Sequence, residues 1–145
     1  MLSVTKYSPE HIAASRARVA SQVAAYCDLR AAARDRAGAD TAALDTAFAS
    51  FEPVFFNNMV LTLDSSFTHR ARALEGKDGN PLNEVRMLCN SLVSNGGVLA
   101  ADKTIRFKPA ASVLGYEIGA EIRLTEADFA RLNEAFFADL ESKYV

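Results

Sequence analysis

The chain has few of the residues that build disulfides and metal centres. Only two cysteines and two histidines occur among its 145 residues. Cys27 and Cys89 fall within helical patterns, and without a secretion signal such a pair is typical of buried free thiols. His11 and His69 belong to neither a Glu-x-x-His pair nor a His-Glu-x-x-His motif. We therefore expect no metal ion and no cofactor.

Motifs of enzyme catalysis are also missing. The sequence contains no Gly-x-Ser-x-Gly elbow and no phosphate loop in which Gly-Lys-Ser/Thr follows a glycine at the required spacing. Cys89 is predicted on the buried stripe of its helix and His69 on a polar face, so the two are not expected to form a nucleophile and its base. No residue is therefore assigned a catalytic role.

Signals for secretion and for membrane insertion are absent as well. The first residues, MLSVTKYSPEH, lack a basic patch followed by an apolar stretch. No segment approaches the roughly 18 apolar residues of a membrane span. The sequence predicts a cytoplasmic protein with no membrane partner.

Charge is unevenly distributed along the chain, although the net charge is only −2. Residues 1–38 hold six basic and three acidic residues, whereas residues 125–145 hold two basic and five acidic ones. We expect these segments to complement each other within the fold or across a dimer. Nucleic-acid binding is the less favoured interpretation, because no basic stripe or exposed aromatic residues accompany the arginines of the first segment: Arg16, Arg18, Arg30, Arg34 and Arg36.

Helix ends can be located from capping residues. The first helix is predicted to begin with Ser8 as N-cap and Pro9 at its first position, and to run to Gly38. A second helix follows Asp40 or Thr41 and is expected to end or kink at Pro53.

Three further helices are predicted. One runs from about Val54 to Leu74 and has an apolar and a polar face. The next has Asn80 as N-cap and ends at Gly96-Gly97, and the last opens with the capping box that starts at Thr125.

Between the last two helices the pattern changes to short, β-branched, partly alternating segments. These are Val98-Leu99, Thr104 to Lys108, and Glu121 to Leu124. We predict a small antiparallel sheet of two or three strands there. The expected fold is mainly α (α+β): one domain over residues 1–145, a bundle of about five helices with a β insertion before the C-terminal helix.

The turn that precedes the fourth helix is the most informative polar segment. It contains two glycines and Lys77, and it leads into a helix N-terminus, which favours anions. The candidate binding residues lie on this turn and on the polar rows of the two flanking helices: Asn58, His69, Arg72, Lys77, Asn83 and Arg86. The alternative is that the turn only connects two helices and that these side chains are simply solvated.

Phenylalanine is concentrated in two places. Five of the nine phenylalanines lie between Phe48 and Phe67, and Phe136-Phe137 forms a second group. Adjacent phenylalanines on a helix lie about 100° apart, so they widen its apolar surface. A dense core, a helix-to-helix dimer interface or an apolar ligand pocket would each account for this width.

Part of the chain resembles a family of small bacterial proteins of unknown function. The resemblance rests on FFNNMVLTLDSSFTHRARALEGKDGNPLNEVRMLCNSL, GVLAADKTIRF, SVLGYEIGAEIRL and AFFADLESKYV, and it covers roughly residues 50–145. It implies a complete, freestanding protein, and it implies no activity, cofactor or catalytic residue.

These observations favour a non-catalytic cytoplasmic homodimer that binds a partner or a small anionic or apolar ligand. The alternative is a small acid–base or anion-handling enzyme centred on His69, Arg72 and Lys77.

Overall fold

The computed structural model describes residues 2–145 and is mainly helical. Its elements are α1 (Pro9–Ala37), α2 (Ala42–Ser65), α3 (Arg72–Glu75), α4 (Pro81–Ser94), the short 3₁₀ helix η1 (Pro109–Ala111) and α5 (Glu126–Tyr144). No helix within residues 2–145 combines the length and the apolar character needed to cross a membrane.

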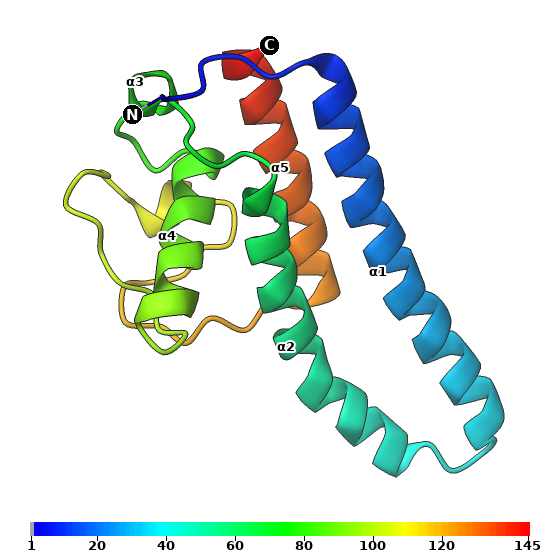
Figure 1. The fold of residues 1–145 in the computed structure, drawn as a ribbon. Helices are drawn as coiled ribbons and strands as arrows, with labels where there is room; N and C mark the ends of the chain where they lie inside the picture. The colour runs from blue at the N-terminus through cyan, green and yellow to red at the C-terminus, as the bar shows by residue number, and fades with distance from the viewer. Residues whose placement is uncertain (1) are drawn as a thin grey trace.

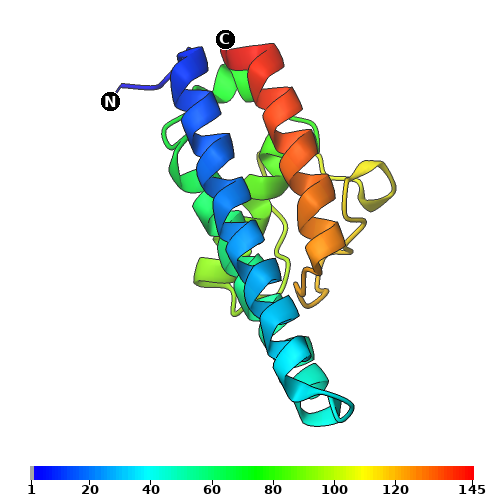
Figure 2. The ribbon, with the colours of Figure 1, turned by 90° about the vertical axis from the view of Figure 1, so that its right-hand side faces the viewer.

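Helix α2 is the central element, because it contacts α1, α4 and α5. The last turns of α1 and the first turns of α2 extend beyond the other helices as a two-helix arm, which is coloured cyan in Figures 1 and 2. At the opposite end, the N-terminal segment lies beside the end of α5, where the Tyr7 backbone N–H donates to the Tyr144 carbonyl at 2.7 Å. At one end of the molecule the N-terminal segment and the end of α5 are therefore hydrogen-bonded to each other, and the arm lies at the other end.

The predicted caps at Ser8, Gly38, Asn80 and Thr125 are confirmed, whereas Thr41 precedes α2 without a side-chain capping hydrogen bond. The Ser8 hydroxyl accepts from the His11 backbone N–H at 3.1 Å, and Gly38 ends α1 with a φ of 68°. The Asn80 side chain caps α4, and Thr125 and Asp128 form the capping box of α5. Each of these residues satisfies a backbone N–H or adopts a backbone conformation that the helix end requires, which is why they can be read from sequence.

Of the two outcomes expected at Pro53, a helix end is wrong, because α2 continues through this proline to Ser65. An interior proline costs about 3 kcal/mol, since it removes a helix hydrogen bond. Packing on both sides of Pro53 offsets this cost. The Tyr26 ring of α1 contacts the Phe48, Phe55 and Phe56 rings of α2, with ring centroids 6.1, 4.8 and 5.3 Å apart.

The predicted helix from Val54 to Leu74 also ends earlier than expected. His69 has a φ of 62°, which an α-helix does not allow. The Val4 backbone donates to the His69 carbonyl at 2.7 Å and accepts from the Ala71 N–H at 2.8 Å. Because the N-terminal segment takes up these backbone groups, the chain leaves the helix and turns toward α3.

The predicted β insertion is not present, since residues 2–145 contain no β-strand. Leu99 exchanges backbone hydrogen bonds with Gly119 and Ala120, but the pairing amounts to one antiparallel bridge between Val98 and Glu121. Arg106 forms a separate parallel bridge with Asp78. Two of the predicted segments therefore meet only at one bridge, and the third, which contains Arg106, pairs with the loop before α4, so no sheet forms.

Most of the phenylalanines build the core. Phe56, Phe67, Phe136 and Phe137 are completely buried, whereas Phe51 on the arm is 45% exposed. The widened apolar surfaces of α2 and α5 are therefore largely covered by neighbouring helices of the same chain. Leu29 and Val54 are also exposed on α1 and α2, while other exposed apolar side chains, such as Val93, lie elsewhere.

Both cysteines are free thiols, as expected. Cys89 is buried, and burial raises the pKa of its thiol to about 12. Burial also raises the pKa of Cys27, whose Sγ lies 3.4 Å from the Glu126 carboxylate. Neither thiol is therefore activated as a nucleophile.

Replacement of Phe56 with alanine should lower the free energy of unfolding by about 3–5 kcal/mol, because it leaves a cavity beneath the Tyr26 ring. Phe51→Ala serves as the matched control on the same helix and should cost about 1 kcal/mol or less. Urea denaturation followed by circular dichroism measures both values. Similar losses for the two variants would contradict this description of the core.

Candidate functional site

The loop between α3 and α4 is held in place by two asparagines. The Asn80 side chain donates to the Glu75 carbonyl at 2.6 Å and accepts from the Asn83 N–H at 2.9 Å. Asn83 is fully buried, and its amide donates to the carbonyls of Gly76 and Asp78 at 3.2 and 2.8 Å. Asn83 therefore shapes the loop that carries Lys77, and its own side chain does not face a ligand.

This loop packs directly against the segment 102–108. The Arg106 N–H donates to the Lys77 carbonyl at 2.7 Å. Gly79 permits the approach, since a Cβ at this position would lie 3.2 Å from the Phe107 Cα. Two loops far apart in the sequence are thereby joined, and Lys77 comes to lie beside Arg106.

Thr104 is fixed from two sides in the second loop. Its hydroxyl donates to the Asp102 carboxylate at 2.6 Å and accepts from the Arg72 guanidinium at 2.8 Å. The hydrogen bonds from the Thr104 hydroxyl and backbone N–H lower the pKa of Asp102. The Asp102 charge is therefore already engaged within its own loop.

Lys77, Lys103, Thr104 and Arg106 line one hollow of about 420 Å³, which we term the basic hollow. Of the sixteen lysines and arginines, seven form no ion pair with a carboxylate of the described residues. Four of these seven are Lys77, Lys103, Arg106 and Lys108. Unpaired positive charge is therefore concentrated on these two loops.

Behind the loops, a carboxylate is buried among arginines. Glu75 is fully buried, and both of its carboxylate oxygens accept hydrogen bonds from the Arg86 guanidinium. Arg70, itself only 4% exposed, lies 3.5 Å from the same carboxylate, and Arg72 lies 3.6 Å from it. Burial acts to lower the pKa of Arg86, but the hydrogen bond and charge of Glu75 outweigh it and raise the pKa.

Further contacts extend this network to α2 and α5. Arg70 donates to Asp64 at 2.7 Å, which connects it to the end of α2. The Lys143 ammonium donates to the Glu75 carbonyl at 3.2 Å, and the Tyr144 hydroxyl donates to the Ala71 carbonyl at 2.8 Å. The network positions Arg72 at the edge of the basic hollow.

The six sequence-predicted binding residues divide into three groups. Arg72 and Lys77 lie at the two-loop region, and Arg86 and Asn83 support it from behind. Asn58 and His69 are exposed and do not line the basic hollow. Asn58 instead donates to the Val54 carbonyl one helical turn away.

Sequence reasoning missed Lys103, Thr104 and Arg106. The sequence pattern predicts a strand from Thr104 to Lys108, and no binding role is assigned to its residues. The three basic residues within six positions, Lys103, Arg106 and Lys108, were the available signal. Their proximity to Lys77 depends on a long-range backbone contact that no local pattern encodes.

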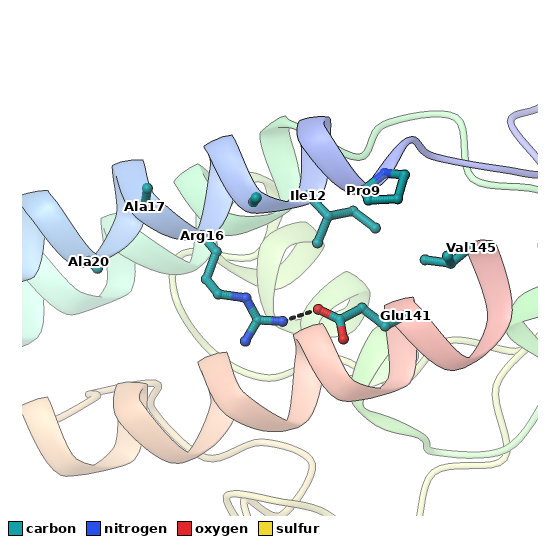
Figure 3. A pocket seen from close by; sticks show the side chains of 8 residues that line it. Pro9, Ile12, Arg16, Ala17, Ala20, Glu141 and Val145 are labelled. Carbon is teal, nitrogen blue, oxygen red and sulfur yellow. Dashed lines mark hydrogen bonds and ion pairs between the residues drawn. The ribbon is translucent and has the colours of Figure 1, made fainter.

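A larger hollow lies elsewhere, between α1 and α5. It has a volume of about 750 Å³ and is lined mainly by apolar side chains, among them Ile12, Ala17 and Val145. Figure 3 shows that Arg16 and Glu141 extend toward each other across it and form an ion pair. The two charged groups of this groove therefore satisfy each other.

The same pairing accounts for the uneven charge of the chain. Arg16 pairs with Glu141, and Arg30 lies 3.3 Å from Glu126, so two ion pairs join the basic first helix to the acidic last helix within one molecule. This confirms the expected complementarity within the fold.

Residues 2–145 contain no group of three or more histidine, cysteine, aspartate and glutamate side chains arranged to hold a metal ion. No protein-family model, curated protein or solved structure matches this chain. The assignment of function therefore rests on the geometry of the site.

Glu75→Gln should lower the free energy of unfolding by about 3 kcal/mol, because it removes the charge that compensates the buried Arg70. Glu121→Gln is the control, since its ion pair with Arg123 is exposed and worth about 1 kcal/mol or less. Guanidinium denaturation curves for both variants measure the difference. Equal stability of the two variants would show that the arginines do not depend on Glu75.

Proposed function

We propose that this is a non-catalytic cytoplasmic binding protein that takes a small anionic ligand, through a phosphate group, in the basic hollow. The observation that carries the proposal is the concentration of unpaired cations at Lys77, Lys103 and Arg106 around a concave surface. Elsewhere in the chain most arginines are paired with carboxylates, so the charge on these two loops has no such compensation.

The lining suits phosphate chemistry. Lysine supplies a mobile ammonium, and arginine can donate two parallel hydrogen bonds to a phosphate. The Thr104 hydroxyl also lines the hollow, but it donates its proton to Asp102, so the two lysines and Arg106 supply the donors to a phosphate. The lining contains no carboxylate or imidazole to act as a general base, which supports binding without catalysis. An acid–base enzyme would have to recruit His69 from outside the hollow.

Lys77→Ala should weaken the binding of inorganic phosphate and pyrophosphate about tenfold, because one charged hydrogen bond contributes roughly 1.4 kcal/mol or more. Lys6→Ala is the matched control, since Lys6 also forms no ion pair and lies outside the basic hollow. Titration at low ionic strength, followed by NMR chemical shifts, measures both affinities. Equal affinities of the two variants, or no binding to the unmodified protein, would refute the proposal.

We also propose that the protein is a homodimer formed through the arm. The arm exposes three large apolar side chains, Leu29, Phe51 and Val54, and a second copy would bury them.

Phe51→Glu should convert this dimer to a monomer, because it places a charge at the centre of the apolar contact. Val93→Glu is the control, since Val93 is 72% exposed but lies on α4, away from the arm. Sedimentation equilibrium at high micromolar concentration measures the association state. A monomeric unmodified protein would contradict dimer formation and would leave the phosphate proposal unaffected.

A further inference from the structure

A second hollow adjoins the basic hollow and also has a volume of about 420 Å³. Arg106 lines both hollows, so its side chain is shared between them. The second one, which we term the side hollow, has apolar walls formed by Pro81, Ala111 and Val113. A ligand group that binds Arg106 from the basic hollow is therefore near the apolar walls of the side hollow.

The side hollow carries less net positive charge than the basic hollow, because its lining includes a carboxylate. Apart from the shared Arg106, its charged residues are one cation, Lys108, and one anion, Asp78. One oxygen of the Asp78 carboxylate accepts from the Asn80 amide at 2.9 Å, and the other has no partner among the described residues. The side hollow consequently suits an uncharged group that has an apolar face and can donate a hydrogen bond.

The far wall of the side hollow is held in position by a buried carboxylate. Glu84 is 3% exposed and accepts the backbone N–H groups of Val113 and Leu114 at 2.8 and 3.0 Å. The Arg131 guanidinium donates to the Val113 carbonyl at 3.3 Å. Because both backbone groups of Val113 are engaged, this wall is formed before any ligand arrives.

The floor of the side hollow is equally constrained. Gly79 lines it, and the backbone of Gly79 lies directly against Phe107. The contact with Phe107 fixes this part of the backbone, so a flat ring can lie against Pro81 and Val113 without a prior rearrangement of the loop. If these loops were flexible, they would lose conformational entropy when the ligand binds, and the affinity would be lower. The hydrogen bonds to Glu84 and Arg131 fix them beforehand.

Resting on the phosphate site proposed above, we propose that the ligand is a nucleoside monophosphate. Its phosphate binds Lys77, Lys103 and Arg106 in the basic hollow. Its base lies against the apolar walls of the side hollow, and a hydroxyl or amino group donates to Asp78. A ligand with a second phosphate fits less well, because the side hollow offers Lys108 together with an opposing carboxylate.

Calorimetric titration of the whole protein with inorganic phosphate, ribose 5-phosphate, AMP and UMP tests this assignment. AMP or UMP should bind at least about tenfold more tightly than inorganic phosphate, because burial of an apolar ring adds to the charged contacts. Ribose 5-phosphate should bind more weakly than the nucleotide, since it leaves the apolar walls uncovered.

Ala111→Leu provides the specific variant, because it narrows the side hollow and leaves the cations unchanged. It should abolish the advantage of the nucleotide while phosphate binding persists. Ala110→Leu is the matched control, since Ala110 is an exposed neighbour in the same 3₁₀ turn and does not line the hollow. This control should bind the nucleotide like the unmodified protein.

Three results would overturn the inference. Equal affinity for nucleotide, ribose 5-phosphate and inorganic phosphate would mean that nothing binds the base, although the phosphate site would stand. If Ala111→Leu and Ala110→Leu weakened nucleotide binding equally, the effect could not be assigned to the side hollow. Failure of every phosphate compound to bind would remove the proposed function and this inference together.

Discussion

The buried Glu75 carboxylate is the interaction on which the arrangement of the loops depends. A four-residue helix such as α3 has too few backbone hydrogen bonds to be stable alone. Its side chains instead join it to α4 through Arg86, and through Arg70 to α2. A buried charge is costly unless it is compensated, so Glu75 and its arginines stabilise one relative placement of these elements and disfavour others. The two loops of the basic hollow are attached to this framework.

The sequence predicted much of the helical fold, because helix ends are encoded locally. Ser8, Asn80 and Thr125 each satisfy backbone groups within three residues, and their side chains do so wherever the helix packs. The course of α2 could not be predicted in the same way. Pro53 disfavours a helix locally, and the aromatic packing that outweighs it comes from Tyr26 on another helix.

The candidate site was predicted in part for the same reason. The turn before α4 leads into a helix N-terminus, which favours anions, and this predicts binding residues nearby. Four of them are Arg72, Lys77, Asn83 and Arg86. Lys103 and Arg106 follow in a segment whose β-branched residues resemble a strand, and only the backbone bond between Arg106 and Lys77 shows that they belong to the same surface. Local patterns identify the residues that build a turn, but not the segment that packs against it.

The contacts of the last helical turn also order the events of folding during synthesis. The arm is formed by neighbouring segments joined by a short turn, so α1 and the start of α2 can pair as soon as they emerge from the ribosome. The region around α3 cannot be completed at that time, because Ala71 and Glu75 are bound by Tyr144 and Lys143. Although α3 lies near the middle of the chain, it acquires its final contacts only when translation reaches these C-terminal residues.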